Sequence, residues 1–408
     1  MMRPLLLLIV VLGSCSLAEA DWPQFRGPGA DGHTAETGLP LTWSTTEHIT
    51  WKQDLPGLAW SSPVIAHGKI FLTTAVEKAE GFALSALCVD EAQGNVLWSQ
   101  ELFEHPLKVE MHKKNSHASP TPVIDGDRVF VHFGSHGTAC LSTSGEVIWK
   151  QILEYHPQHG NGGSPALIGN MLVICCDGRD VQYVVGLDKT TGEVRWKKER
   201  GTTPAKGFSF CTPLALEVKG KVQAICPGSD AVIAYNPADG EELWRLNYPG
   251  GYSVIPRPIY GSGLIFVCTG YDKPKLLAID PTGQGDVTAT HLKWETDKSV
   301  PHSASLLFHD GLLYMVSDKG IASCLDAVTG DQKWQERIGG NFSASPLLAE
   351  GRVYFQDENG TTTVVAAGPE FKELAKNKLT DERTYASYAI DKGAIFLRSE
   401  SGLYRIEE

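Results

Sequence analysis

Tryptophan recurs at nearly even steps along this chain, and most copies close the same short phrase. The phrase is clearest in LDKTTGEVRW, which ends at Trp196, and in LDAVTGDQKW, which ends at Trp334. The series continues at Trp51, Trp98, Trp149, Trp244 and Trp294. A period of about fifty residues indicates a repeat architecture, in which one unit cannot bury its apolar face without its neighbours. We therefore expect a closed or stacked array that spans most of the chain.

Short apolar runs make up each repeat. In the first repeat three runs cover residues 61–68, 69–75 and 82–90, and the next run carries Trp98. Each run is rich in β-branched or aromatic residues and is bounded by glycine, aspartate or asparagine, which is the pattern of strands joined by tight turns. Helical periodicity is almost absent. The repeat is therefore expected to be a four-stranded antiparallel sheet.

The opening strand of the repeat can be followed through the whole chain. Its copies begin at Pro63, Pro122, Pro165, Pro213, Pro258, Leu306, Pro346 and Tyr388. The tryptophan strands are equally numerous if LAKNKL, around Leu374, is a degenerate copy in which leucine replaces tryptophan. The two series are out of phase, because Trp51 precedes the first opening strand and the chain ends on the third strand of the last unit.

A ring accounts for both leftover strands. If the strand of Trp51 completes the sheet that the last residues begin, residues 51–408 form an all-β, eight-bladed β-propeller of four-stranded antiparallel blades. Closure of this kind also hides the sheet edges that an open array would expose. We expect the protein to be a monomer.

The repeated phrase has a mechanical explanation. Gly192 lies where a tight hairpin needs a positive backbone angle, and Asp188 can cap the same turn through side-chain hydrogen bonds. The equivalent residues are Gly94, Gly145, Gly240 and Gly330, and Asp90, Asp280 and Asp326. The tryptophans are expected to pack between neighbouring sheets and so to dock the blades together.

Residues 1–20 have the layout of a signal peptide. Arg3 precedes an apolar run, and the small residues Ala18 and Ala20 favour cleavage after Ala20. Lipidation of Cys15 within LGSC is the alternative, which we favour less because this is a loose lipoprotein box. The protein is therefore expected in the periplasm or outside the cell.

Residues 21–50 form a separate segment ahead of the first tryptophan strand. Trp22, Phe25 and Arg26, followed by a Gly-Pro pair, predict an extended arm that aromatic residues anchor across the disc. A docking peptide for another protein is the alternative.

The charge and hydropathy of the chain exclude some classes of binding partner. A formal net charge of -12 opposes binding to phosphate backbones and to anionic lipids. Beyond the leader no stretch approaches the ~20 apolar residues that a membrane span needs. We expect a protein or small-molecule ligand, no nucleic acid and no transmembrane span.

The tryptophan phrase, repeated around eight sheets, resembles the PQQ-type β-propeller repeat. That repeat occurs in quinoprotein alcohol dehydrogenases and in the BamB-type lipoprotein of outer-membrane β-barrel assembly. The opening DWPQFRGPGADG, residues 21–32, further resembles a group of secreted bacterial proteins with this propeller. The resemblance implies the fold over essentially the whole mature chain. It implies little about function, because blade-docking residues are present whether or not a ligand binds.

The cysteines are interpreted as packing residues. Cys88, Cys140 and Cys324 share one repeat position, which otherwise holds glycine or alanine, so they behave as small buried hydrophobes rather than as disulfide partners. The adjacent Cys175 and Cys176 resemble the neighbouring-cysteine bridge of quinoprotein alcohol dehydrogenases. Their run, MLVICCDG, has the pattern of a regular strand with successive side chains on opposite faces, which disfavours a bridge.

Polar residues precede or begin several opening strands, and they are our candidate site. They are His117, His159, Asn161, Arg257, His302 and Asn341. In a propeller these segments converge on one mouth of the axial channel, so the side chains could line a funnel that binds an anionic small molecule or a metal. The alternative is a funnel that is simply wet and polar, and no pair has the spacing of a compact zinc motif.

A reactive constellation is harder to find. Quinoprotein dehydrogenases need calcium held by carboxylate and amide oxygens, a carboxylate base and an aromatic floor, and the sequence offers no residue-by-residue match. We therefore predict a non-catalytic binding or scaffolding module that uses its axial funnel or one face. The alternatives are a PQQ- and calcium-dependent alcohol dehydrogenase with an atypical site in the same funnel, and an envelope or outer-membrane protein assembly factor.

Overall fold

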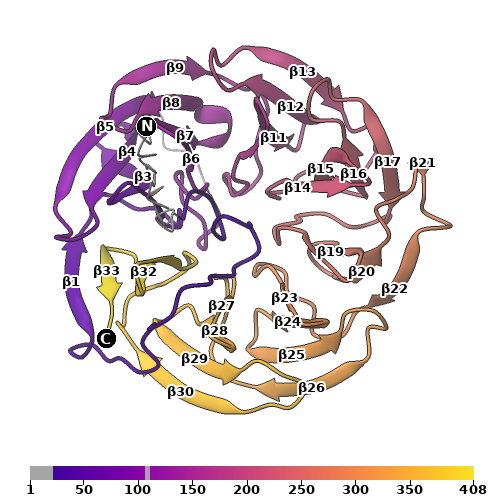
Figure 1. Cartoon of the computed structure of the whole chain (residues 1–408). Coiled ribbons are helices and arrows are strands. Elements are labelled where there is room, and N and C mark those ends of the chain that lie inside the picture. Colours follow the sequence, from indigo (N-terminus) through magenta and orange to yellow (C-terminus); the bar gives the residue numbers. More distant parts are fainter. Residues whose placement is uncertain (1–21, 106–110) are drawn as a thin grey trace, which may run out of the picture.

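The structure, a computed structural model, describes residues 22–105 and 111–408, which form a ring of eight β-sheets around a central axis (Figure 1). The predicted signal peptide and Cys15 lie outside the described residues. Within the described part the single helical element is the 3-10 turn η1 (Gly134–His136). No helix there has the length and apolar character needed to cross a membrane.

The first four blades follow the chain from their inner to their outer strands. Blade 1 holds β2 (Val64–Ala66), β3 (Lys69–Lys78), β4 (Gly81–Asp90) and β5 (Val96–His105). Blade 2 holds β6 (Val123–Asp125), β7 (Arg128–His132), β8 (Thr138–Ser142) and β9 (Val147–Gln151). Blade 3 holds β10 (Ala166–Ile168), β11 (Met171–Asp177), β12 (Gln182–Asp188) and β13 (Val194–Glu199). Blade 4 holds β14 (Leu214–Val218), β15 (Lys221–Pro227), β16 (Ala231–Tyr235) and β17 (Glu242–Asn247).

The remaining blades continue the ring. Blade 5 holds β18 (Ile259–Gly261), β19 (Leu264–Cys268), β20 (Leu276–Ile279) and β22 (Leu292–Thr296). Blade 6 holds β23 (Leu307–His309), β24 (Leu312–Val316), β25 (Ile321–Asp326) and β26 (Gln332–Arg337). Blade 7 holds β27 (Leu347–Ala349), β28 (Arg352–Gln356), β29 (Thr361–Ala366) and β30 (Glu373–Lys378). The short β21 (Gly285–Asp286) pairs in parallel with β17 and adds a fifth strand to blade 4, which the sequence pattern did not indicate.

Blade 8 closes the ring with both ends of the chain. It holds β31 (Ala389–Asp391), β32 (Ala394–Arg398), β33 (Gly402–Ile406) and, on the outside, β1 (Ile49–Asp54). β1 runs antiparallel to β33, with Trp51 opposite Arg405 and Asp54 opposite Gly402. The predicted eight-bladed propeller, completed by an N-terminal strand, is therefore confirmed.

The tryptophans dock each blade onto the next one. The Trp196 Nε1–H donates to the carbonyl of Pro237 at 2.8 Å, and its ring lies on Gly240, where a Cβ atom would stand 2.6 Å from the ring. Gly240 has a φ of +72°, so both its conformation and the absence of a side chain are required. Trp51, Trp98, Trp149, Trp294 and Trp334 make the same kind of hydrogen bond to the next blade. Trp244 departs from the pattern and donates to Gln223 of its own blade.

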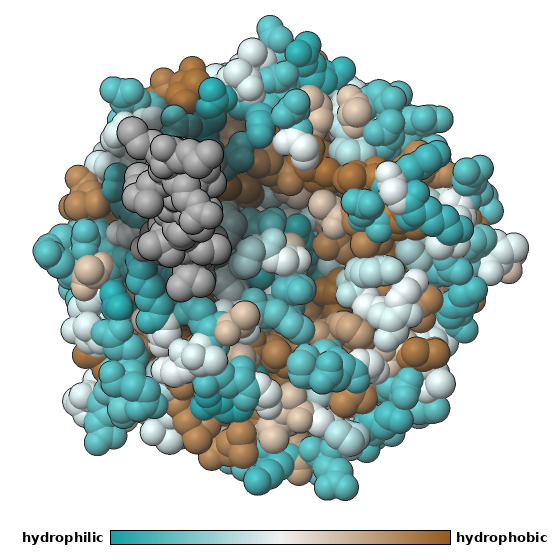
Figure 2. All heavy atoms as spheres, in the orientation of Figure 1, coloured by the Kyte–Doolittle hydropathy of each residue, from teal (hydrophilic) through white to brown (hydrophobic). Residues whose placement is uncertain are grey.

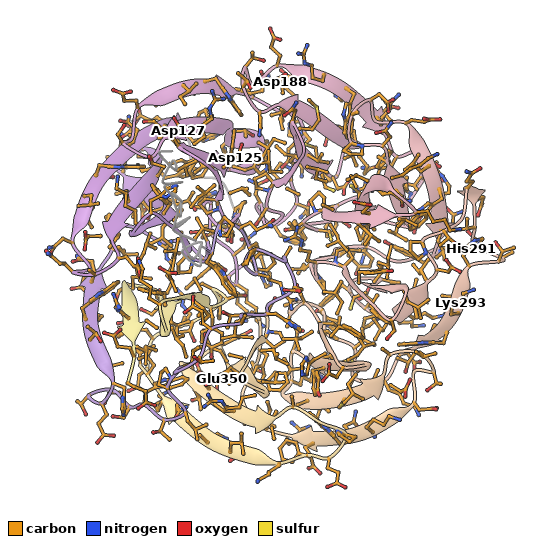
Figure 3. The ribbon with its side chains drawn as sticks, in the orientation of Figure 1. Asp125, Asp127, Asp188, His291, Lys293 and Glu350 are labelled. Carbon is orange, nitrogen blue, oxygen red and sulfur yellow. The ribbon has the colours of Figure 1, made fainter. Side chains whose placement is uncertain are left out.

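Aspartates cap these turns as the sequence predicts. Asp188, at the rim of the disc in Figure 3, accepts hydrogen bonds from the backbone N–H groups of Thr190 and Thr191. Asp90, Asp280 and Asp326 cap their own turns in the same way. These bonds hold the turn in the shape that receives the tryptophan of the preceding blade.

Blade 7 corrects one detail of the predicted repeat. Its strand β30 is present, but Ala375, not Leu374, pairs with Val364 in the register that elsewhere belongs to tryptophan. Blade 8 has no turn between its outer two strands, because β33 and β1 come from opposite ends of the chain. A tryptophan from blade 7 would therefore have no turn to dock onto. Trp43 of the arm stacks on Tyr354 of β28 instead, with ring centroids 6.3 Å apart and planes 12° apart.

The arm crosses the middle of the disc before it joins blade 8 (Figure 1). The backbone of Trp22 exchanges hydrogen bonds with Ile65 of blade 1, and Gly32 accepts one from Leu348 of blade 7. Glu350, labelled in Figure 3, then accepts hydrogen bonds from the N–H groups of Gly38 and Leu39. Because Glu350 lies in the turn between β27 and β28, the arm closes the end of the channel where the first and second strands of each blade meet.

Candidate binding site at the open end of the axial channel

A belt of hydroxyl groups surrounds the axis where the chain enters the inner strands. In each bond of the belt a backbone N–H donates to the Ser or Thr hydroxyl of the next blade, at 2.9–3.0 Å. The seven hydroxyls belong to Ser62, Thr121, Ser164, Thr212, Ser305, Ser345 and Ser387. We call these seven residues the hydroxyl belt. Its members are all at most 6% exposed, so the belt fastens the blades from inside as the tryptophans do from outside.

Arg257 takes the place of a hydroxyl in blade 5. Its backbone N–H donates to Ser305, but it has no hydroxyl to receive the N–H of Thr212, so the belt is open at this point. Its guanidinium donates from Nε to the carbonyl of Pro213 and from Nη1 to the carbonyl of Phe25 in the arm. Arg257 therefore ties the arm to the inner wall of the channel.

A cavity of about 110 Å³ lies inside the belt. All seven belt residues line it, and Phe25 of the arm lines it as well. The remaining lining comes from aromatic or small residues of the loops, chiefly Trp60, Phe210, Tyr385, Ser119, Ser303 and Ser343. Because the arm crosses at one end of the channel, the cavity is reached from the end where the loops enter the inner strands.

Arginine side chains are buried in the interior of the propeller. Arg26, Arg257 and Arg398 are 1%, 2% and 0% exposed, and within the described chain none of the three forms an ion pair. Burial lowers the pKa of Arg26 to about 9 and that of Arg257 to about 10, although the nearby carboxylate of Asp31 acts on both in the opposite direction. Burial alone lowers the pKa of Arg398 to about 9. The interior therefore holds these three buried guanidinium groups, although the protein as a whole is acidic and the carboxylate of Asp31 acts on two of them.

Aromatic rings form an arc around half of the open mouth. Successive rings lie 5.0–6.3 Å apart between centroids, in the order His112, His159, Phe208, Tyr252, Tyr271 and His302. We call this series the aromatic arc. Its rings meet edge to face or tilted, and Phe208 also contacts Phe210 of the cavity wall at 6.1 Å. Tyr271 is 53% exposed, so the arc presents apolar surface to solvent. Figure 2 shows one face of the disc, on which hydrophilic residues cover most of the edge and hydrophobic residues are exposed between them in several places.

The six predicted funnel residues are divided among different environments. His159 and His302 belong to the aromatic arc, and Arg257 stands in the belt, as described above. His117 is 7% exposed and stacks on Phe82 with ring centroids 3.8 Å apart, between blades 1 and 2. Asn161 is buried and donates to the carbonyl of Phe133, while Asn341 is exposed at the edge of blade 7. The structure places none of the six side chains on the cavity wall.

The residues of this site do not fit a calcium-held quinone. Small-molecule sites usually enclose ~300–1,000 Å³, and this cavity is about 110 Å³ with no carboxylate in its lining. Across residues 22–105 and 111–408 no group of three or more His, Cys, Asp or Glu side chains could hold a metal ion. Hydroxyl donors and buried guanidinium groups are the reverse of the carboxylate and amide oxygens that calcium requires.

The cysteines pack as the sequence suggests. Cys88, Cys140 and Cys324 each lie opposite the tryptophan of their own blade, which explains why the position accepts only small residues. Burial raises the pKa of the Cys88 and Cys140 thiols to about 12, so both are protonated at neutral pH. Cys175 and Cys176 lie in the regular part of β11, opposite Val184 and Tyr183 respectively.

The belt and the cavity define a closed propeller whose channel is blocked at one end and open at the other. A family model described as outer membrane protein assembly factor BamB matches residues 83–299 and 278–369, which together exceed half of the chain. The chain therefore belongs to this family of PQQ-type propellers. BamB of Burkholderia pseudomallei (strain K96243) is 24% identical over 248 residues, which make up 58% of this chain and 60% of that protein. The match thus spans less than two thirds of the relative's length.

Solved structures share the fold at low sequence identity. BamB from Moraxella catarrhalis is 12% identical, with a TM-score of 0.61 over 88% of this chain and 99% of that one. Quinohemoprotein alcohol dehydrogenase from Comamonas testosteroni is 12% identical, with a TM-score of 0.66 over 95% of this chain and 80% of that one. The predicted resemblance to both groups is confirmed at the level of the fold, and at these identities it carries nothing further.

Proposed function

We propose that this protein is a non-catalytic binding module that holds an extended segment of a partner polypeptide against the aromatic arc. The signal-peptide layout of residues 1–20 supports work in the periplasm or outside the cell, and membership of an assembly-factor family supports an envelope protein as the partner. The observation that carries the proposal is the arc itself. Six rings from six different loops stand in one continuous series beside the open mouth.

The arc has the properties of a preformed recognition surface. Tyrosine and other aromatic side chains supply large contact area at low conformational cost, and they dominate binding energy at protein interfaces. Tyr252 is fixed before binding, because Lys206 donates to its hydroxyl at 2.8 Å and that hydroxyl donates to Asp272 at 2.5 Å. The ammonium of Lys206 also lies 4.2 Å from the centre of the Tyr252 ring. A rigid, partly exposed aromatic series suits an extended chain that lays successive apolar side chains along it.

The test is a binding measurement with paired tyrosine variants. Dye-labelled peptides with the alternating aromatic and polar pattern of β-barrel strands are titrated with the wild-type protein, and binding is followed by fluorescence anisotropy. Tyr252→Ala and Tyr271→Ala together should weaken binding at least about tenfold, because each removes a ring of the arc. Tyr260→Ala is the matched control, because Tyr260 is 44% exposed but lies in β18, next to the turn at the other end of the blade.

Two results would overturn the proposal. The first is equal binding of the double variant and the wild-type protein. The second is equal binding of peptides in which every aromatic residue is replaced by serine, since the arc would then contribute no recognition.

A further inference from the structure

The hydroxyl belt has unused hydrogen-bond donors. Each belt hydroxyl accepts one backbone N–H, and within the described part of the chain none of the seven donates its own proton to another group. A Ser or Thr hydroxyl can donate one hydrogen bond as well as accept. All seven residues line the same cavity. Seven O–H groups that need acceptors therefore surround one small space.

The charged groups near the cavity indicate whether it binds an anion or a cation. Each hydroxyl oxygen retains a lone pair, so hydroxyls alone could also face a cation. The cavity wall contains no carboxylate, however, and the guanidinium of Arg257 lies behind the floor, where it donates to the carbonyl of the lining residue Phe25. Arg26, the next residue of the arm, is fully buried close enough to Arg257 to repel it, and its Nε and Nη1 have no hydrogen-bond partner. The carboxylate of Asp31 offsets part of the cost of burying these two cations, and a bound anion would offset more of it.

We propose that the axial cavity binds a small oxyanion, of the size of a carboxylate or a phosphate, through the hydroxyl belt, with the buried charge of Arg257 beside its floor. An oxyanion offers several acceptor lone pairs in a compact volume, which matches a ring of donors. The cavity of about 110 Å³ is several times the ~10–15 Å³ that one water requires, and it is too small for a cofactor. The anion is either free in solution or the carboxylate of an acidic side chain that reaches down the open mouth. This site does not depend on what occupies the aromatic arc.

The experiment is calorimetric titration of the whole protein with inorganic phosphate and, separately, with acetate, each against sodium chloride of equal ionic strength. Arg257→Ser removes the buried charge beside the cavity and should weaken binding at least about tenfold, because a charge in a site of low dielectric constant attracts an anion strongly. Arg257→Lys keeps the charge and should retain most of the affinity. Arg337→Ser is the control for net charge, because Arg337 is exposed on the outer strand β26.

A second pair of variants tests the belt without touching the arginine. Thr121→Val keeps the shape of the side chain and removes its hydroxyl, so it should weaken anion binding severalfold, whereas Thr121→Ser keeps the hydroxyl and the affinity. This pair remains informative if Arg257→Ser fails to fold.

Each outcome of these titrations either supports the anion site or overturns it. Saturable binding of phosphate, of acetate or of both supports the site, and the ratio of the two affinities tells a free inorganic anion from a carboxylate on a peptide. The proposal is overturned if neither anion binds saturably, or if Arg257→Ser and Thr121→Val both bind as the wild-type protein does. Loss of peptide binding at the aromatic arc leaves these titrations unaffected, so the two proposals fail separately.

Discussion

Two concentric rings hold the blades of this propeller together, and they do so by different chemistry. The outer ring uses tryptophans, most of which bury the indole against a glycine of the next blade and donate one hydrogen bond to that blade. The inner ring uses hydroxyls, each of which accepts one hydrogen bond from the preceding blade. The outer contact gains most of its free energy from apolar burial, and the inner contact gains little beyond one hydrogen bond.

This difference separates stability from binding capacity. An indole that lies on a glycine has no remaining group for a ligand, whereas a belt hydroxyl that has accepted one bond still has a proton to donate. A propeller can therefore fasten its blades at the periphery and still have hydroxyl donors at the axis that are available to a ligand. The arm contributes to both rings, because Trp43 packs at the periphery of blade 7 and Phe25 closes the floor of the cavity.

The largest expected effect on stability comes from a substitution in the outer ring of tryptophans. Trp196→Ala should lower the free energy of unfolding by about 3–5 kcal/mol, because it removes a buried ring and leaves a cavity between blades 3 and 4. Chemical denaturation against Val194→Ala, an exposed position of the same strand, measures the difference. A loss as small as that of the control would show that the indole does not fasten the blades.

Trp43 tests whether the arm replaces the missing eighth tryptophan. Trp43 is 4% exposed and stacks on Tyr354, so Trp43→Ala should cost about 3 kcal/mol, close to the cost at Trp196. Limited proteolysis should then cut the arm before the blades. An arm that stays protected, with unchanged denaturation, would mean that Trp43 is only a surface anchor.

Buried histidines between the two rings predict a pH dependence. Burial lowers the pKa of His132 to about 3 and that of His136 to about 4. The unfolded chain therefore takes up protons below about pH 6.5 that the folded protein does not, so stability falls as the pH drops, by up to ~1.4 kcal/mol per unit for each histidine. The pKa of Asp180 and that of Glu382 lie at about 2, so their contributions are lost only in stronger acid.

Denaturation at pH 5, 6 and 7 measures this slope. His136→Phe removes one of these titrating groups and should reduce the loss between pH 6.5 and 5. The carboxyl of Asp391, whose pKa burial raises to about 7, acts in the opposite direction in the wild-type protein and in the variant. An unchanged slope in the variant would place the titration elsewhere in the molecule.

The smallest expected effect on stability comes from a substitution in the inner ring of hydroxyls. Ser164→Ala leaves the N–H of Thr121 without its acceptor and should cost about 1–2 kcal/mol. Ser144→Ala, in an exposed turn, is the control for a hydroxyl outside the belt. A cost equal to that of Trp196→Ala would remove the distinction between the two rings.

The outer ring could be predicted from the sequence because its residue type is rare and evenly spaced. Trp51 and its equivalents mark one position per repeat, and their phase against the opening strands predicted the closure through β1. Trp43 could not be predicted in the same way, because it lies outside the repeat and substitutes for a position that blade 7 lacks.

The inner ring also has a signal in the sequence. Ser62, Ser345 and their equivalents stand directly before the opening strands, with the same period as the tryptophans. Aligning these positions would have revealed a column of hydroxyls with Arg257 as the exception. The aromatic arc gave no such signal, because its rings come from loops of unequal length and occupy no common repeat position.

The most direct test of the account is to measure phosphate binding by calorimetry in Trp196→Ala and Thr121→Val side by side, at a temperature where both are folded. The account predicts that Trp196→Ala, although much less stable, binds phosphate as the wild-type protein does, whereas Thr121→Val binds severalfold more weakly. Weak binding by the tryptophan variant together with full binding by the threonine variant would contradict it.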